Sequence, residues 1–147
     1  MRYVLLFYVA FSLATNAVQG AGQTGLTARK NILATGGVLA TNNGVLAGRE
    51  TFFDTSAIDV VGGNDYTVRM ESMDFTPHVW VQPVGAVSPE RKIAEAVGAW
   101  LPAPVSPVPT RAAEFSFRAP ATGRLQIVVT TTEPRRPGYY SLMVWMR

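Results

Sequence analysis

Hydrophobic and polar residues alternate in two neighbouring runs within segment 64–85. The apolar members that share one side of these runs are Tyr66, Val68, Met70, Val79 and Val81. Successive side chains of a strand point to opposite faces, so each run predicts a strand with one buried face. The polar break between the runs contains one aromatic residue, Phe75. We expect an antiparallel strand pair with Phe75 closing the end of the core.

Similar alternation occurs on both sides of this pair. It predicts further strands over 51–61, 114–118, 124–132 and 139–147, with a hairpin at Asn42-Asn43-Gly44. In the last of these strands, Tyr140, Leu142, Val144 and Met146 share one face, and Tyr139, Ser141, Met143 and Trp145 share the other. Many short strands joined by turns in a chain of this length predict a single all-β domain, an antiparallel β-sandwich.

One segment breaks the alternation. Ser88 followed by Pro89 is typical of a helix start, and Gly98 is placed to end such a helix. A proline-rich strap over 101–109 follows, which we expect to be extended polyproline II. This insertion predicts either a cover that packs Ile93, Val97, Trp100 and Leu101 over a sheet, or a binding loop.

The N-terminus is typical of a secretory signal peptide. Met1-Arg2 precedes an apolar run over 3–13, and small and polar residues follow. Val18 and Gly20 suit cleavage before Ala21, and Thr15 with Ala17 offer an alternative. We therefore expect a signal peptide over 1–20, a polar segment over 21–35 and the sandwich domain over 36–147. After cleavage no stable membrane span is expected, because the apolar run is too short.

Composition narrows the class of protein. The chain of 147 residues has a net charge of +3 with scattered basic residues, which argues against nucleic-acid binding. It contains no cysteine, so an exported domain of this kind must rely on its core rather than on disulfides. This favours a bacterial periplasmic or extracellular protein.

Several motifs in order resemble the bacterial pre-peptidase C-terminal (PPC) domain. They are Gly44-Val45-Leu46, Phe53-Asp54, Asp65 through Pro77, Phe117 through Gly123, and Gly138 through Val144. The resemblance covers about Gly36 to the end and implies a jelly-roll-like sandwich. It also implies a non-catalytic role beside exported enzymes, in secretion, folding or substrate attachment. Thr76 stands where the family often has an aspartate, which makes the calcium of some relatives doubtful here.

The sequence contains few residues that could act in catalysis or bind a metal ion. His78 is the single histidine and is expected on the polar side of a strand, without the partners that a hydrolase or a zinc site needs. No nucleophile elbow, Walker loop or zinc-protease motif is present. We therefore expect no enzyme activity and no cofactor. Asp54, Asp65 and Asp74 are dispersed and form only a doubtful calcium set.

Aromatic residues are the best candidates for binding. If the faces are assigned as above, Trp80, Tyr139 and Trp145 point outward and could stack on sugars or anchor a protein, with Trp100 nearby. The alternative is that the insertion covers them and forms a second small core. Three hypotheses follow: an accessory domain for exported enzymes, a carbohydrate-binding module that holds an extracellular polymer, and an envelope protein that pairs with a secreted enzyme through the strap.

Overall fold

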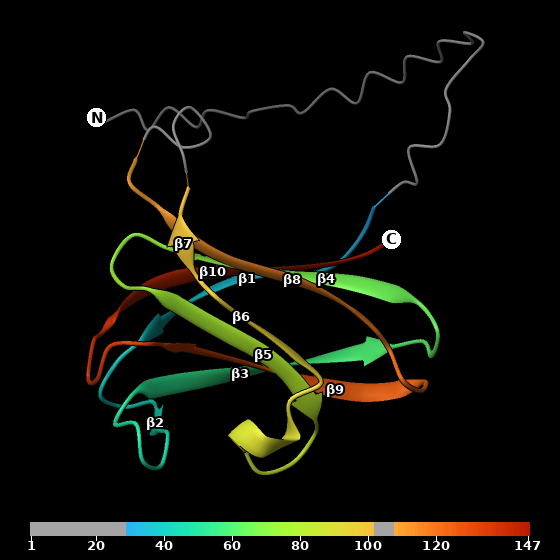
Figure 1. Ribbon diagram of the computed structural model, residues 1–147, viewed down its shortest axis with the longest axis horizontal. Coiled ribbons are helices and arrows are strands. Elements are labelled where there is room, and N and C mark those ends of the chain that lie inside the picture. Colours follow the sequence, from blue (N-terminus) through green and yellow to red (C-terminus); the bar gives the residue numbers. More distant parts are fainter. Residues whose placement is uncertain (1–28, 102–107) are drawn as a thin grey trace, which may run out of the picture.

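Two five-stranded antiparallel sheets pack face to face in the computed structural model, which describes residues 29–101 and 108–147 (Figure 1). Sheet A has the order β1 (Lys30–Leu39), β10 (Gly138–Met146), β4 (Asp65–Ser72), β8 (Arg111–Arg118) and β7 (Ala99–Trp100). Sheet B has the order β2 (Gly44–Val45), β3 (Phe52–Val60), β9 (Gly123–Thr131), β5 (Pro77–Pro83) and β6 (Ala94–Val97). The predicted all-β sandwich is confirmed. The expected signal peptide and residues 102–107 of the expected strap lie outside the described residues.

The core lies between the two sheets and uses the predicted inward residues. Val68 and Met70 of β4 are buried with Leu142 and Val144 of β10 on one side, and with residues of β5 and β9 on the other. Phe75, in the turn between β4 and β5, is fully buried in the same cluster. Because each inward side chain follows from the period-2 alternation, the faces of β4, β8, β9 and β10 were predictable from the sequence.

The N-terminal part of the sandwich differs from the prediction in two ways. β1 begins at Lys30, so six residues assigned to the polar segment over 21–35 belong to sheet A, and the expected domain start at Gly36 falls inside the strand. The predicted hairpin at Asn42-Asn43-Gly44 is wrong. A turn does form there, with Asn43 accepting a hydrogen bond from the Ala40 amide at 2.7 Å. It connects β1 in sheet A to β2 in sheet B instead of pairing the two strands.

The predicted helix over 88–98 is also wrong. Ser88 does accept a hydrogen bond from the Glu90 amide, but only a 3₁₀ turn, η1 (Pro89–Arg91), forms. The following residues form β6, which pairs with β5, Ala94 opposite Val81 and Ala96 opposite Val79. Without β6, the buried strand β5 would leave a row of backbone groups unpaired. Satisfying those groups outweighs a weak helical preference.

Gly98 moves the chain from one sheet to the other. It lies between β6 of sheet B and β7 of sheet A. These two strands follow one another on one side of the sandwich (Figure 1). The Gly98 amide donates to the Pro77 carbonyl at 2.7 Å, and a Cβ here would come within 2.6 Å of the Pro77 ring. The glycine is therefore needed for close approach rather than for ending a helix. The expected cover is only partly formed, since Ile93 packs on the core while Val97 and Trp100 are exposed.

In the described part of the chain, no helix has the length and apolar character needed to cross a membrane.

Replacing Phe75 with alanine tests its predicted role at the end of the core. We expect Phe75→Ala to lower the free energy of unfolding by about 3–5 kcal/mol, because a fully buried ring is lost and a cavity remains. The matched control in the same turn is Met73→Ala, an exposed side chain whose loss should change stability by less than about 0.5 kcal/mol. Urea denaturation followed by fluorescence measures both. Equal effects of the two substitutions would contradict the assignment.

Candidate functional site

The four predicted aromatic residues do not form one site. Tyr139 and Trp145 lie on β10 and point outward from sheet A, whereas Trp80 lies on β5 of sheet B, on the opposite side of the sandwich. Trp100 lies on the two-residue edge strand β7. The strand alternation predicted correctly that these side chains of β10 and β5 face away from the main core. It could not show that the two strands belong to different sheets.

Trp80 is buried, and its predicted role in binding is wrong. It is 1% exposed and packs with Leu46, Val128 and Val87 in a second, smaller cluster on the outer side of sheet B. Its indole N–H donates to the Gln82 side chain at 2.9 Å, and the Lys92 ammonium lies over the ring. A second small core does form around Trp80, but the prediction that the insertion covers it is wrong, because the apolar residues of this cluster come from outside the insertion. The cover comes from the loops around Leu46 and Val87, which had not been predicted.

His78 is also buried, and its prediction as a surface residue is wrong. It is 3% exposed, and its Nε2 lies 2.8 Å from the Glu95 carboxylate of β6. Its Nδ1 is buried without a hydrogen-bond partner among the described residues. A neutral ring that donates through Nε2–H and leaves only an acceptor at Nδ1 fits these contacts. Burial lowers the pKa of His78, opposed by the hydrogen bond to Glu95, while the charges of Lys92 and Arg49 lower it further.

The outer surface of sheet A, here called the A face, carries the exposed Tyr139 and the partly buried Trp145. Cross-strand pairing places Met143 beside Arg69, Ser141 beside Glu71 and Val38 beside Tyr139. One depression is lined by Arg69, Glu71, Met143 and Trp145, and a second by Glu71, Ser141 and Tyr139 among others. The two share Glu71. The first holds about 410 Å³ and the second about 260 Å³, compared with the ~300–1,000 Å³ of a pocket that encloses a small molecule. The A face therefore offers two small, adjoining depressions.

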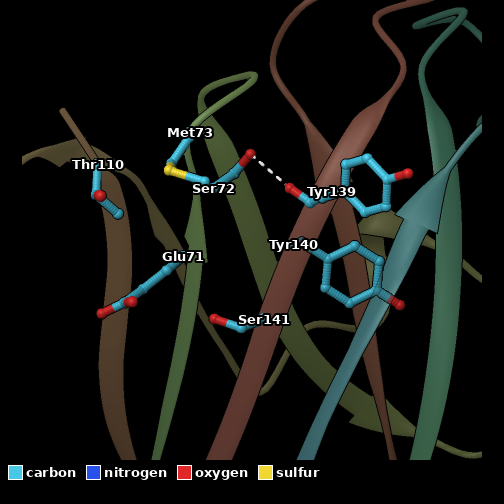
Figure 2. A pocket seen from close by; sticks show the side chains of 7 residues that line it. All are labelled: Glu71, Ser72, Met73, Thr110, Tyr139, Tyr140 and Ser141. Carbon is cyan, nitrogen blue, oxygen red and sulfur yellow. Dashed lines mark hydrogen bonds between the residues drawn. The ribbon is translucent and has the colours of Figure 1, made fainter. Parts of the chain in front are cut away.

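Tyr139 is the most exposed aromatic residue of this face, at 70%. The backbone N–H and C=O groups of Tyr139 are nevertheless both hydrogen-bonded. The amide donates to the Asp74 carboxylate at 2.7 Å, and the carbonyl accepts from the Ser72 hydroxyl at 2.8 Å. Figure 2 shows the second of these bonds and the residues from the end of β4 that lie beside β10. An exposed ring on a fixed backbone loses little conformational freedom when it binds.

Charged groups flank the aromatic residues. Arg69 forms ion pairs with Glu71 at 2.6 Å and with Glu114 at 3.1 Å, across β4 and β8. These three side chains point outward and are at least partly exposed. They were not among the residues predicted to bind a ligand, although their outward position follows from the same alternation that places Val68 and Met70 inside. They supply hydrogen-bond donors and acceptors within a few residues of the aromatic rings.

Trp145 and Trp100 are each already covered on one side by an arginine. The Arg29 guanidinium lies 5.4 Å from the Trp145 ring centre, and that of Arg111 lies 4.2 Å from the Trp100 ring centre. The indole N–H of Trp145 is inaccessible and has no partner among the described residues. Trp100 is 57% exposed, at the edge of the sheet. These contacts leave Tyr139 as the aromatic ring on β10 that is most open to a ligand.

The three aspartates of the predicted calcium set have separate partners. Asp54 accepts from the Tyr140 hydroxyl at 2.8 Å, and burial and this bond raise the pKa of Tyr140 well above its usual range. Asp65 forms a two-pronged ion pair with Arg118, which lowers the pKa of Asp65. Asp74 holds the Tyr139 amide. Over residues 29–101 and 108–147, no three histidine or acidic side chains gather where they could bind a metal ion. The predicted calcium set is therefore not assembled.

The sequence matches no protein-family model and no curated protein. The resemblance to the PPC domain stays a prediction.

The buried His78 should make stability depend on pH. Because its pKa is lower in the folded than in the unfolded chain, the unfolded state takes up the proton first. Stability is then lost as the pH falls below the unfolded value of 6.5 towards the folded pKa. We expect His78→Gln, which keeps a donor for Glu95 but cannot titrate, to lose less stability over that range. Urea denaturation of both proteins in steps from pH 7.5 downward measures this, and identical pH dependence in the variant would contradict it.

Proposed function

We propose that the protein is an exported, non-catalytic binding domain that acts through the A face. The observation that carries the proposal is Tyr139, an exposed ring whose backbone is held by Asp74 and Ser72. Tyr139 lines the depression that contains Glu71 and Ser141, and also a further depression that it forms with Val38 and Arg136 among others. Exposed aromatic residues on rigid elements are typical of binding surfaces. The apolar N-terminal run over 3–13 supports export, and the β-sandwich is compatible with the PPC-like accessory role that the motifs imply.

The environment of His78 supports a non-catalytic role. A general base must reach the proton that it removes, within hydrogen-bond distance or through one water. His78, the single histidine of the chain, is buried, and its ring is bound to Glu95 and lies beside Trp80. It lies on the outer side of sheet B, away from the A face. The histidine is thus placed to stabilise the β5–β6 pair.

Carbohydrate is the ligand class that the A face favours. Tyr139 and Trp145 lie six residues apart on the same face of β10, which separates them by about 20 Å along the strand. Arg69 and Glu71 lie on the adjacent strand β4, and Glu114 lies on β8 beyond it; all three have polar groups that are partly exposed. An aromatic ring that stacks on a sugar, next to charged groups that bind its hydroxyls, suits an extended polysaccharide better than a compact metabolite.

Removing the Tyr139 ring tests this proposal directly. Insoluble cellulose, chitin and peptidoglycan serve as probes, and the protein that remains in solution after incubation is measured. We expect at least one polymer to retain the protein, Tyr139→Ala to weaken retention about tenfold or more, and Tyr139→Phe to keep most of it, because the stacking surface is unchanged.

The matched control is Val61→Ala, an exposed residue in the turn after β3, which should leave retention unchanged. All variants should unfold at the same temperature, since neither side chain is part of the core. If Tyr139→Ala binds as well as the unchanged protein, the A face is not the binding surface. If none of the three polymers retains the protein, carbohydrate is the wrong ligand class.

A further inference from the structure

The four ends of the two sheets differ in how well they are protected against further pairing. Three end in short strands: β2 and β7 have two residues each, and β6 has four and carries Glu95. The fourth end is β1, which has ten residues and, within the described part of the chain, pairs only with β10. A long edge strand presents a row of free backbone N–H and C=O groups that can accept another strand.

Charged residues protect the other exposed strand segments. The part of β3 that does not pair with the short β2 carries Asp54 and Asp59. The part of β8 that does not pair with β7 carries Glu114 and Arg118. Charges on an edge strand oppose edge-to-edge pairing. β1 has no charged residue and no proline from Asn31 to Leu39. It is therefore the one long edge in the described chain that lacks this protection.

We propose that β1 pairs with β1 of a second copy of this chain, antiparallel, to join two copies of sheet A into one continuous sheet. The regular part of β1 lies after the irregularity between Asn31 and Leu33. Pairing centred on Gly36 sets Leu33 opposite Leu39 of the other copy, Ala34 opposite Val38, and Thr35 opposite Gly37. Every pair joins residues of the same face, so the inward and outward sides of the two sheets continue without a break.

Charge and exposure favour a second copy of the chain in this arrangement. The basic residues of this region, Arg29 and Lys30, lie at the start of β1. Antiparallel pairing places them at opposite ends of the new ladder, whereas parallel pairing would bring like charges together. The exposed side chain of Val38 gains an apolar partner, Ala34 of the other copy. Gly36 has no side chain at the crossing point, which permits close approach of the two backbones.

The pairing has a consequence for binding that rests on the proposed function of the A face. Because paired residues share a face, the two-fold axis is perpendicular to the sheet, and both A faces point to the same side. Two Tyr139 rings would then face one polymer. Engagement of two linked sites increases overall affinity without any new contact at either site.

Light scattering of the purified protein, obtained by expression of the full chain, tests the pairing independently of any ligand. We expect a monomer–dimer equilibrium over a dilution series. Thr35→Lys adds an exposed like charge on each side of the two-fold axis and should weaken the dimer about tenfold or more. The matched control, Thr55→Lys, makes the same change at an exposed position of β3 and should leave the equilibrium unchanged.

A second measurement uses the absence of cysteine from the chain. Gly36→Cys places two thiols opposite each other across the axis and should form an intermolecular disulfide under mild oxidation, whereas Thr55→Cys should not. A Cβ at Gly36 lies 3.2 Å from the Tyr140 carbonyl, so the unfolding temperature of the reduced variant is measured as well. A monomer at all concentrations overturns the proposal. A dimer that resists Thr35→Lys, or equal cross-linking of the Thr55→Cys variant, overturns it too.

Discussion

The burial of one face of each sheet against the other is the interaction on which the structure depends. Val68 and Met70 of β4, at the centre of sheet A, pack in one cluster with Val79 and Val81 of β5, in sheet B. These two strands follow each other directly in the chain and are joined by the turn that contains Phe75. Burial of large apolar side chains contributes about 1.5–3 kcal/mol each. The β4–β5 connection thus brings the two sheets together and closes one end of the core.

The same turn also shapes the candidate site. Ser72 and Asp74 belong to the segment that carries the chain from sheet A to sheet B, and their side chains hold the backbone of Tyr139. Asp74 therefore has a role that differs from metal binding: it fixes the start of β10. A close contact supports this arrangement, since a Cβ at Gly138 would come within 2.4 Å of the Asp74 side chain. The exposed ring and the buried core are thus coupled through one short segment.

The two outer faces of the sandwich have different character. On sheet B, the loops around Leu46 and Val87 cover Trp80, and the β5–β6 pair buries His78 against Glu95. On sheet A, the corresponding surface carries the exposed Tyr139, the partly exposed Met143 and the Arg69 ion pairs. A surface with exposed aromatic residues and adjacent charges is suited to recognition, while a covered one contributes to stability. The proposed binding surface and the uncharged edge of β1 both belong to sheet A.

Alternation alone determined the fold class and the inward faces of β4, β8, β9 and β10, because a strand side chain can point only to one of two sides. It also placed Tyr139 and Trp145 outward. It could not determine which strands share a sheet, and so it grouped Trp80 with residues on the opposite side of the molecule.

The tertiary structure decided the rest, for identifiable physical reasons. Residues 94–97 form a strand because the backbone of the buried β5 needs a partner, and this need exceeds the local helix signal of Ser88 and Pro89. His78 is buried because β6 brings Glu95 to its ring. The aspartates are separated because each has a nearer partner from a distant part of the chain. Long-range pairing, which no local pattern contains, therefore decided which polar and aromatic residues remain available for binding.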